Sequence, residues 1–234
     1  MTNDTIQLKV KQRINKLASN DYDNIMPWQI IEAFNKAQVD WCRRNLQGTN
    51  LSKQGDESSK RRIDDLQILL TEEKLSMVKK ETYYISSKLP ADYFEFKRVS
   101  SKATTDCCPE KRALTVYLTE EANIDLTLKD VNKKPSFPWG ETVCTFAGNK
   151  LKIYTNGEFD IVDAVLVYYK QPTKIQIKGI SDPYTGQVSL VDVECEFKDD
   201  LVEILIDECV KILAGDLEDM TANQIAENSV EQNN

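Results

Sequence analysis

Apolar side chains recur with helical spacing near both ends of this 234-residue chain. Ile30, Phe34, Ala37 and Trp41 follow one another at intervals of four, three and four residues, which predicts a helix with one buried face. Pro27 suits the first turn of that helix, which we expect to run to about Leu46. Two further helices with apolar stripes are predicted, a loosely amphipathic one over 5–17 and a strongly striped one over 198–217. A polar loop is expected at 48–59, with helix resuming over 60–70, and 221–231 is a candidate for a last helix.

The middle of the chain has the composition of strands. The run 161–170, IVDAVLVYYK, is rich in β-branched and aromatic residues and predicts a central strand. The pairs Gly148-Asn149 and Asn156-Gly157 indicate tight turns, and Asn123 to Val131 is ambiguous between helix and strand. The other predicted strands cover 81–86, 93–102, 113–118, 142–147 and 151–155.

This order of helices, strands and helix predicts an α+β fold. Residues 1–74 form an N-terminal helical part, 75–197 an inserted antiparallel β domain that is either a sheet or a small sandwich, and 198–234 a C-terminal helical segment with a flexible acidic end. Neither helical part has enough apolar surface alone, so we expect them to pack together as a helical bundle.

Charge is uneven along the chain, because residues 198–234 hold 2 basic and 10 acidic side chains and so carry the whole net charge of −8. Such a segment is either a solvated helix face or disordered end, or a contact for a basic partner. The N-terminus lacks the apolar core of a signal peptide, and no stretch is apolar enough to span a membrane, so we expect a protein made and used in a cytosol, without a membrane partner.

The residues that most often carry chemistry are missing. The chain has no histidine, no glycine-rich phosphate loop and no cysteine spacing that suits a metal, which predicts no enzyme activity, no cofactor and no metal site. The six cysteines are expected to be reduced thiols. The adjacent pair Cys107 and Cys108 is interpreted as small apolar filler in a loop rather than as a redox or metal site.

Two blocks of sequence together resemble a known family. The first reads AFNKAQVDWCRRNL followed by NLSKQGDESSKRRIDDLQILL, and the second reads PSFPWGETVCTFAGNKLKIYTNGEFDIVDAVLVYYKQP. They resemble the ring, or head-to-tail adaptor (connector), proteins of short-tailed bacteriophages, especially of the crAss-like phages. The layout resembles that family too, with a Leu-Pro-x-Asp turn at 89–92 and a strand that ends in Tyr-Tyr-Lys-x-Pro at 168–172. The resemblance covers about residues 25–220.

The resemblance implies a structural virion protein that assembles in the host cytoplasm. Such a protein forms a homo-oligomeric ring, typically a dodecamer, at the portal vertex, where it extends the DNA channel below the portal protein and docks other tail ring or hub proteins. Genomic DNA would pass through without sequence-specific binding. The interface candidates on this sequence are Trp28, Phe34, Trp41, Arg43, Arg44, Phe137, Trp139, Leu201, Leu205 and Ile212.

Other hypotheses remain for these residues. A helix stripe belongs to a core more often than to an interface, and the aromatic segment from Pro135 to Gly140 is either a loop pinned to the sheet by its large rings or a ligand platform. The alternative function is a cytosolic small-ligand-binding module or enzyme with a pocket near Phe137 and Trp139. A nucleic-acid-binding regulator is disfavoured by the sequence pI of about 4.8.

Overall fold

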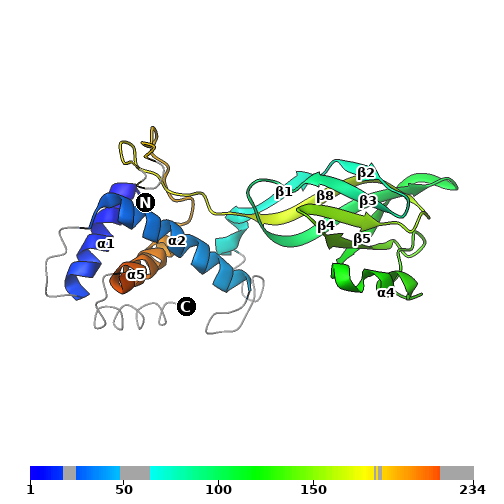
Figure 1. Cartoon of the computed structure of the whole chain (residues 1–234), viewed down its shortest axis with the longest axis horizontal. Helices are drawn as coiled ribbons and strands as arrows, with labels where there is room; N and C mark the ends of the chain where they lie inside the picture. The colour runs from blue at the N-terminus through cyan, green and yellow to red at the C-terminus, as the bar shows by residue number, and fades with distance from the viewer. Residues whose placement is uncertain (18–24, 48–63, 182, 184–185, 217–234) are drawn as a thin grey trace. The chain divides into compact units, whose positions relative to one another are not determined.

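The protein is mixed α+β and divides into two compact units in this computed structural model (Figure 1). The structure describes residues 1–17, 25–47, 64–181, 183 and 186–216. The helical unit comprises Met1–Ile68 and Pro172–Asn234, and the strand unit comprises Leu69–Gln171. The sequence placed the boundaries at 74/75 and 197/198 instead. The first boundary differs because residues 70–74 form a strand of the sheet, and the second because described residues after 171 contact the helices, as Ile175 does with Asn35 and Phe197 with Trp41.

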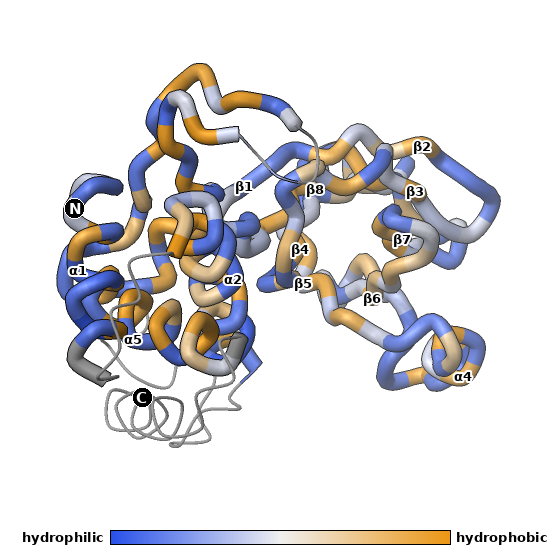
Figure 2. The backbone as a smooth tube through the Cα atoms, turned by 60° about the vertical axis from the view of Figure 1, so that its left-hand side comes forward, coloured by the Kyte–Doolittle hydropathy of each residue, from blue (hydrophilic) through white to orange (hydrophobic). Residues whose placement is uncertain are grey.

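In the helical unit, three helices lie where the sequence predicts them: α1 (Asn3–Leu17), α2 (Pro27–Leu46) and α5 (Asp199–Asp216). At the start of α2, Pro27 fills the first turn, and the Gln29 side-chain oxygen accepts a hydrogen bond of 2.8 Å from the backbone N–H of Met26. The helix α5 contacts both α1 and α2. Hydrophobic stretches recur along these helices (Figure 2), and Ile6, Val10 and Ile14 of α1 are almost completely buried.

The strand unit is one eight-stranded sheet with the strand order β1-β8-β4-β5-β6-β7-β3-β2. Its strands are β1 (Leu70–Lys74), β2 (Met77–Lys79), β3 (Tyr83–Lys88), β4 (Tyr93–Thr105), β5 (Cys108–Leu118), β6 (Glu141–Phe146), β7 (Lys150–Tyr154) and β8 (Asp160–Lys170). All pairs are antiparallel except β5 with β6, which corrects the prediction of a purely antiparallel domain. A parallel pair needs a crossover, and here the crossover contains the short helix α4 (Ile124–Lys129), where the sequence was ambiguous.

The sheet curls until its two edges meet. The edge strands β1 and β2 are separated in sequence only by Leu75 and Ser76, so the edges must lie side by side. The backbone hydrogen bonds from Leu75 N–H to the Ala164 carbonyl and from Ser87 N–H to the Ser76 carbonyl, both 2.9 Å, continue the pairing on the two sides of this junction. Curling hides the edges that an open sheet would expose.

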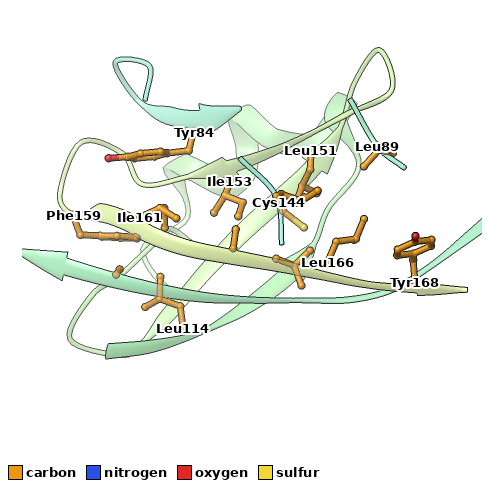
Figure 3. Packing of buried hydrophobic residues seen from close by; sticks show 14 residues of the cluster. Tyr84, Leu89, Leu114, Cys144, Leu151, Ile153, Phe159, Ile161, Leu166 and Tyr168 are labelled. Carbon is orange, nitrogen blue, oxygen red and sulfur yellow. The ribbon is translucent and has the colours of Figure 1, made fainter. Parts of the chain in front are cut away.

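The interior of the curled sheet is a single apolar cluster (Figure 3). The strand β8 supplies four buried residues to this cluster, as expected of the predicted central strand. They are Ile161, Ala164, Leu166 and Tyr168. Both predicted turns are tight turns with positive φ, at Gly148 and Asn149 (each φ 58°) and at Asn156 and Gly157. These turns fix which residues of β7 and β8 face inward.

One of the other predicted helices differs from the structure. Helix was expected from Lys60 to Leu70, but helical structure ends at a 3-10 turn, Gln67–Leu69, and β1 begins at Leu70. The polar loop at 48–59 and the last helix at 221–231 lie outside the described residues.

Candidate interaction surfaces

The apolar stripes of the helices are core. Phe34 and Leu205 have no exposed surface, and Trp41 and Leu201 are buried as well. The Trp41 ring meets the Phe197 ring edge-to-face, with 6.0 Å between centroids. These four interface candidates therefore stabilise the helical unit itself and present no surface to a partner.

The remaining candidates on the helices differ in exposure. Arg43 is exposed, whereas Trp28 and Ile212 are half-buried. Arg44 forms an ion pair with Glu208 of α5, whose side chain is only 6% exposed. Arg44 therefore joins α2 to α5 instead of reaching outward.

Several acidic side chains at the start of the C-terminal segment form ion pairs with basic residues of the same chain. Glu203 of α5 forms ion pairs with Lys9 and Arg13 of α1, and Arg13 also contacts Asp207 at 2.6 Å. Burial works against ionisation of Glu203, but the hydrogen bond from Lys9 and the charge of Arg13 outweigh it and lower its pKa. The basic face of α1 is thus the partner of these α5 carboxylates.

The aromatic segment from Pro135 to Gly140, here called the tryptophan turn, is held firmly against the sheet. Ser136 and Glu141 exchange two backbone hydrogen bonds, and the Gly140 carbonyl accepts one of 2.8 Å from Thr115 on β5. Phe137 packs on the sheet core, with its ring centroid 6.1 Å from that of Phe159. Gly140 has a φ of 70°, a conformation that suits glycine.

The turn presents Trp139 to solvent, with 81% of the residue's surface exposed. The prediction that both rings pin the loop therefore holds for Phe137 and not for Trp139. A rigid backbone that carries an exposed tryptophan is typical of a contact residue, because little conformational entropy is lost on binding. The flanking segments 108–113 and 129–141 hold five basic and three acidic residues, but Glu158 lies 4.0 Å from Lys134 and Asp163 lies 3.8 Å from Lys111, so the surroundings of the turn have no marked net charge.

The described residues of 172–197, that is 172–181, 183 and 186–197, belong to the helical unit and form a second surface, here called the arm. Its two halves pair at Gln176 with Val193 and at Ser181 with Val188. The Asn3 amide nitrogen on α1 donates to the carbonyls of Gln176 at 2.9 Å and Val193 at 3.0 Å, and thereby joins both halves.

A second asparagine holds the same end of the arm. The Asn35 side chain on α2 accepts a hydrogen bond of 2.8 Å from the Ile175 N–H and donates one of 3.3 Å to the Ile175 carbonyl. Gln38 donates to Asn35 at 3.1 Å, which orients the asparagine amide. The base of the arm is therefore fixed to two helices.

Beyond its base the arm exposes apolar side chains. Val188, Leu190 and Val191 are 53%, 82% and 58% exposed, and the hydrophobic stretches of the arm stand out in Figure 2. From the sequence, this segment was expected in the strand domain, and none of its residues was an interface candidate. The signal present was the cluster of Val188, Leu190 and Val191 after Gly186, but periodicity cannot separate an arm from a sheet strand when the two have the same apolar pattern.

The adjacent cysteines Cys107 and Cys108 lie at the exposed turn between β4 and β5, so they are not apolar filler. The Thr105 hydroxyl lies 3.2 Å from the Cys107 sulfur. Hydrogen bonds from Thr105 and then from Cys108 lower the pKa of Cys107, whereas the hydrogen bond and charge of Cys107 raise the pKa of Cys108. Cys107 is therefore the more reactive thiol of the pair.

We expect two of the six thiols to react rapidly with a maleimide or an aromatic disulfide in the native protein. Burial raises the pKa of Cys144 to about 12 and that of Cys195 to about 11, and it also raises the pKa values of Cys42 and Cys209. Mass spectrometry of briefly labelled protein should find the label on Cys107 and Cys108, and Cys107→Ser should remove the fastest phase. Rapid labelling of a buried cysteine would contradict this assignment.

Comparison with known proteins assigns no family. Neither a scan against protein-family models nor a search of curated proteins finds a match for this chain. Across the described ranges, no cluster of three or more side chains is placed to hold a metal ion. In the same part of the chain, no helix has both the length and the apolar character needed to cross a membrane.

Proposed function

We propose that this protein is a structural component of a phage virion: a ring protein of the head-to-tail connector at the portal vertex. One observation carries the proposal. Among the residues that the structure describes, the arm and the tryptophan turn expose apolar side chains on a braced backbone, and they belong to different units.

A ring needs two such surfaces on every subunit. In a heterologous assembly, each copy uses one surface to contact a different surface of its neighbour. The assembly closes into a ring when the rotation from one subunit to the next fits the symmetry. Because the chain resembles connector proteins, we expect the ring to contain twelve subunits. The partners would be other copies of the chain, the portal protein and further tail ring or hub proteins.

Charge is compatible with a subunit that lines or surrounds a DNA channel. The strand unit, 69–171, holds 15 basic and 15 acidic residues, and the helical unit carries the whole net charge of −8. A surface without a strong positive field lets DNA pass without tight phosphate binding. In this proposal α1, α2 and α5 form the helical bundle of the subunit, and the strand unit is an insertion that supplies a docking surface.

The test is co-sedimentation with virus particles. An antibody to the purified chain is followed through a density gradient of lysate from the source culture, and the particle fractions are analysed by quantitative mass spectrometry. A single-vertex ring predicts that the chain sediments with DNA-filled particles at a few copies per particle, far fewer than the capsid protein. A chain found wholly at the soluble top of the gradient would exclude a virion role.

A further inference from the structure

We propose that the turn between β4 and β5 carries a covalent modification site, at which the sulfur of Cys107 exchanges with a small, positively charged disulfide. The reacting part of the site consists of Thr105, Cys107 and Cys108, and the carboxylates of Asp106 and Glu110 set its charge. The site is independent of the proposed ring function, because it lies within one copy of the chain.

The pairing of β4 with β5 holds the three reacting side chains together. Thr105, the last residue of β4, pairs with Cys108, the first residue of β5, so only Asp106 and Cys107 lie in the turn between them. Side chains of directly opposed residues on neighbouring strands lie close enough to interact. Cys107 and Cys108 are both exposed, so a small molecule in solution can reach their sulfur atoms.

The two thiols have different roles in this site. The Thr105 hydroxyl lies 3.2 Å from the Cys107 sulfur, and hydrogen bonds from Thr105 and from Cys108 favour the Cys107 thiolate. Cys108 keeps its proton more firmly, because its hydrogen bond to Cys107 and the negative charge there raise its pKa. An exposed thiol with a lowered pKa beside a second thiol is typical of cysteines that react with oxidants. Cys107 is therefore the attacking sulfur, and Cys108 is the donor that stabilises it.

The reaction is a thiol–disulfide exchange, and the small disulfide is the oxidant. The Cys107 thiol first loses its proton to solvent, and its sulfur then attacks one sulfur of the disulfide. A new S–S bond forms to Cys107 while the S–S bond of the reagent breaks. The other half of the reagent leaves as a thiolate and takes up a proton, so one thiol and one disulfide are consumed and one of each is produced.

The product should remain a mixed disulfide on Cys107. Cys108 could displace the attached half only by forming a disulfide between adjacent residues. Cα atoms joined by a trans peptide lie about 3.8 Å apart, whereas the Cα atoms of a disulfide usually lie about 4.4–6.8 Å apart. Closing that bond would strain the turn, so the adduct on Cys107 is expected to accumulate until an added thiol removes it.

Charge near the two sulfur atoms selects the reagent. The Asp106 carboxylate works against ionisation of Cys107, and the Glu110 carboxylate works against ionisation of Cys108, so each thiol has a negative charge nearby. A negative field attracts a cationic disulfide and repels an anionic one. The site should therefore prefer cystamine, which carries two ammonium groups, over oxidised glutathione, which carries a net negative charge.

The basic side chains of the adjoining strand segments act elsewhere. Lys111 lies 3.8 Å from Asp163, and the charge of Lys102 lowers the pKa of the same carboxylate. The Arg112 guanidinium lies over the Phe137 ring, 5.9 Å from its centroid. These contacts leave the carboxylates as the charges that act on the two thiols.

The experiment measures exchange rates of the full-length chain with cystamine and with oxidised glutathione, near neutral pH and at low salt. Intact-protein mass gives the rate of adduct formation, and peptide mass spectrometry locates the adduct. Each rate is divided by the rate of the same reagent with N-acetylcysteinamide, which corrects for the reagent's own reactivity. The corrected rates should favour cystamine at least about fivefold, and the preference should shrink towards unity in about 0.5 M salt.

Variants separate charge from hydrogen bonding. Asp106→Asn with Glu110→Gln should abolish the preference for cystamine and leave exchange itself intact. Thr105→Val, which keeps the shape of the side chain without its hydroxyl, should move the pH profile of exchange to higher pH and slow it at least about threefold at neutral pH. Thr105→Ser, the matched control, should restore the wild-type profile. Circular dichroism confirms that every variant is folded.

Four results would overturn the inference. They are corrected rates that are equal for the two reagents, a preference that persists in the double carboxylate variant, a pH profile that is the same for Thr105→Val and the wild type, and an adduct located mainly on a buried cysteine. Accumulation of a Cys107–Cys108 disulfide, seen as the loss of two hydrogen atoms, would also contradict it. None of these results bears on co-sedimentation with virus particles, so the modification site and the ring function stand or fall separately.

Discussion

Replacing Trp41 by alanine is expected to lower the free energy of unfolding of the helical unit by about 3–5 kcal/mol. Trp41 is 4% exposed and meets the ring of Phe197 edge-to-face, so its removal leaves a large cavity that the neighbouring helices cannot fill. Urea unfolding followed by far-ultraviolet circular dichroism and by tryptophan fluorescence measures the loss.

Trp139→Ala is the matched control, because the same side chain is removed from an exposed position. Its effect on stability should stay within about 0.5 kcal/mol. Equal losses for the two variants would contradict the distinction between a core tryptophan at 41 and a contact tryptophan at 139. A stable Trp41→Ala protein that fails only in assembly would show that Trp41 is an interface residue.

Arg44→Met is expected to lower the free energy of unfolding by about 2–3 kcal/mol. This loss is somewhat smaller than the loss expected on breaking a fully buried ion pair, because the arginine is partly exposed. The variant keeps the apolar stem of the side chain but leaves the buried carboxylate of Glu208 without the arginine charge. Equilibrium urea unfolding at neutral pH and low salt gives the value.

Two controls make the cause identifiable. The neighbouring Arg43→Met should have a much smaller effect, because Arg43 is exposed. Adding Glu208→Leu to Arg44→Met should restore most of the stability, since the buried carboxylate that lost the arginine charge is then removed as well. If the double variant is no more stable than Arg44→Met, the loss comes from packing and not from the ion pair.

The helices were predictable because their signals are local. Pro27, the four-three-four spacing of the stripe and the acids at 199 and 200 set the ends and buried faces of α2 and α5, and the structure agrees within one or two residues. The strand β8 was predictable for a similar reason, since its run of β-branched and aromatic residues favours a largely buried strand. The two turns were predictable because only a few residue pairs adopt positive φ readily.

The rest depends on contacts between distant residues. The strands β1 and β2, with sequences LTEEK and MVK, have no strong apolar alternation and form because they pair with β8 and β3. The arm is fixed by asparagines at positions 3 and 35, far from it in sequence. Trp139 and Phe137 look equivalent in the sequence, and only the fold decides that one is buried against the core and the other exposed.

The two ends of the strand unit are neighbours, because Leu70 of β1 pairs with Tyr169 of β8. The chain therefore enters and leaves this unit at almost the same place, through one pair of adjoining strands. With both ends at one place, the unit can be lengthened or its outer turns altered without changing the path of the polypeptide through the helices. Trp139 lies on this unit, so a change at position 139 leaves the helical framework as it is.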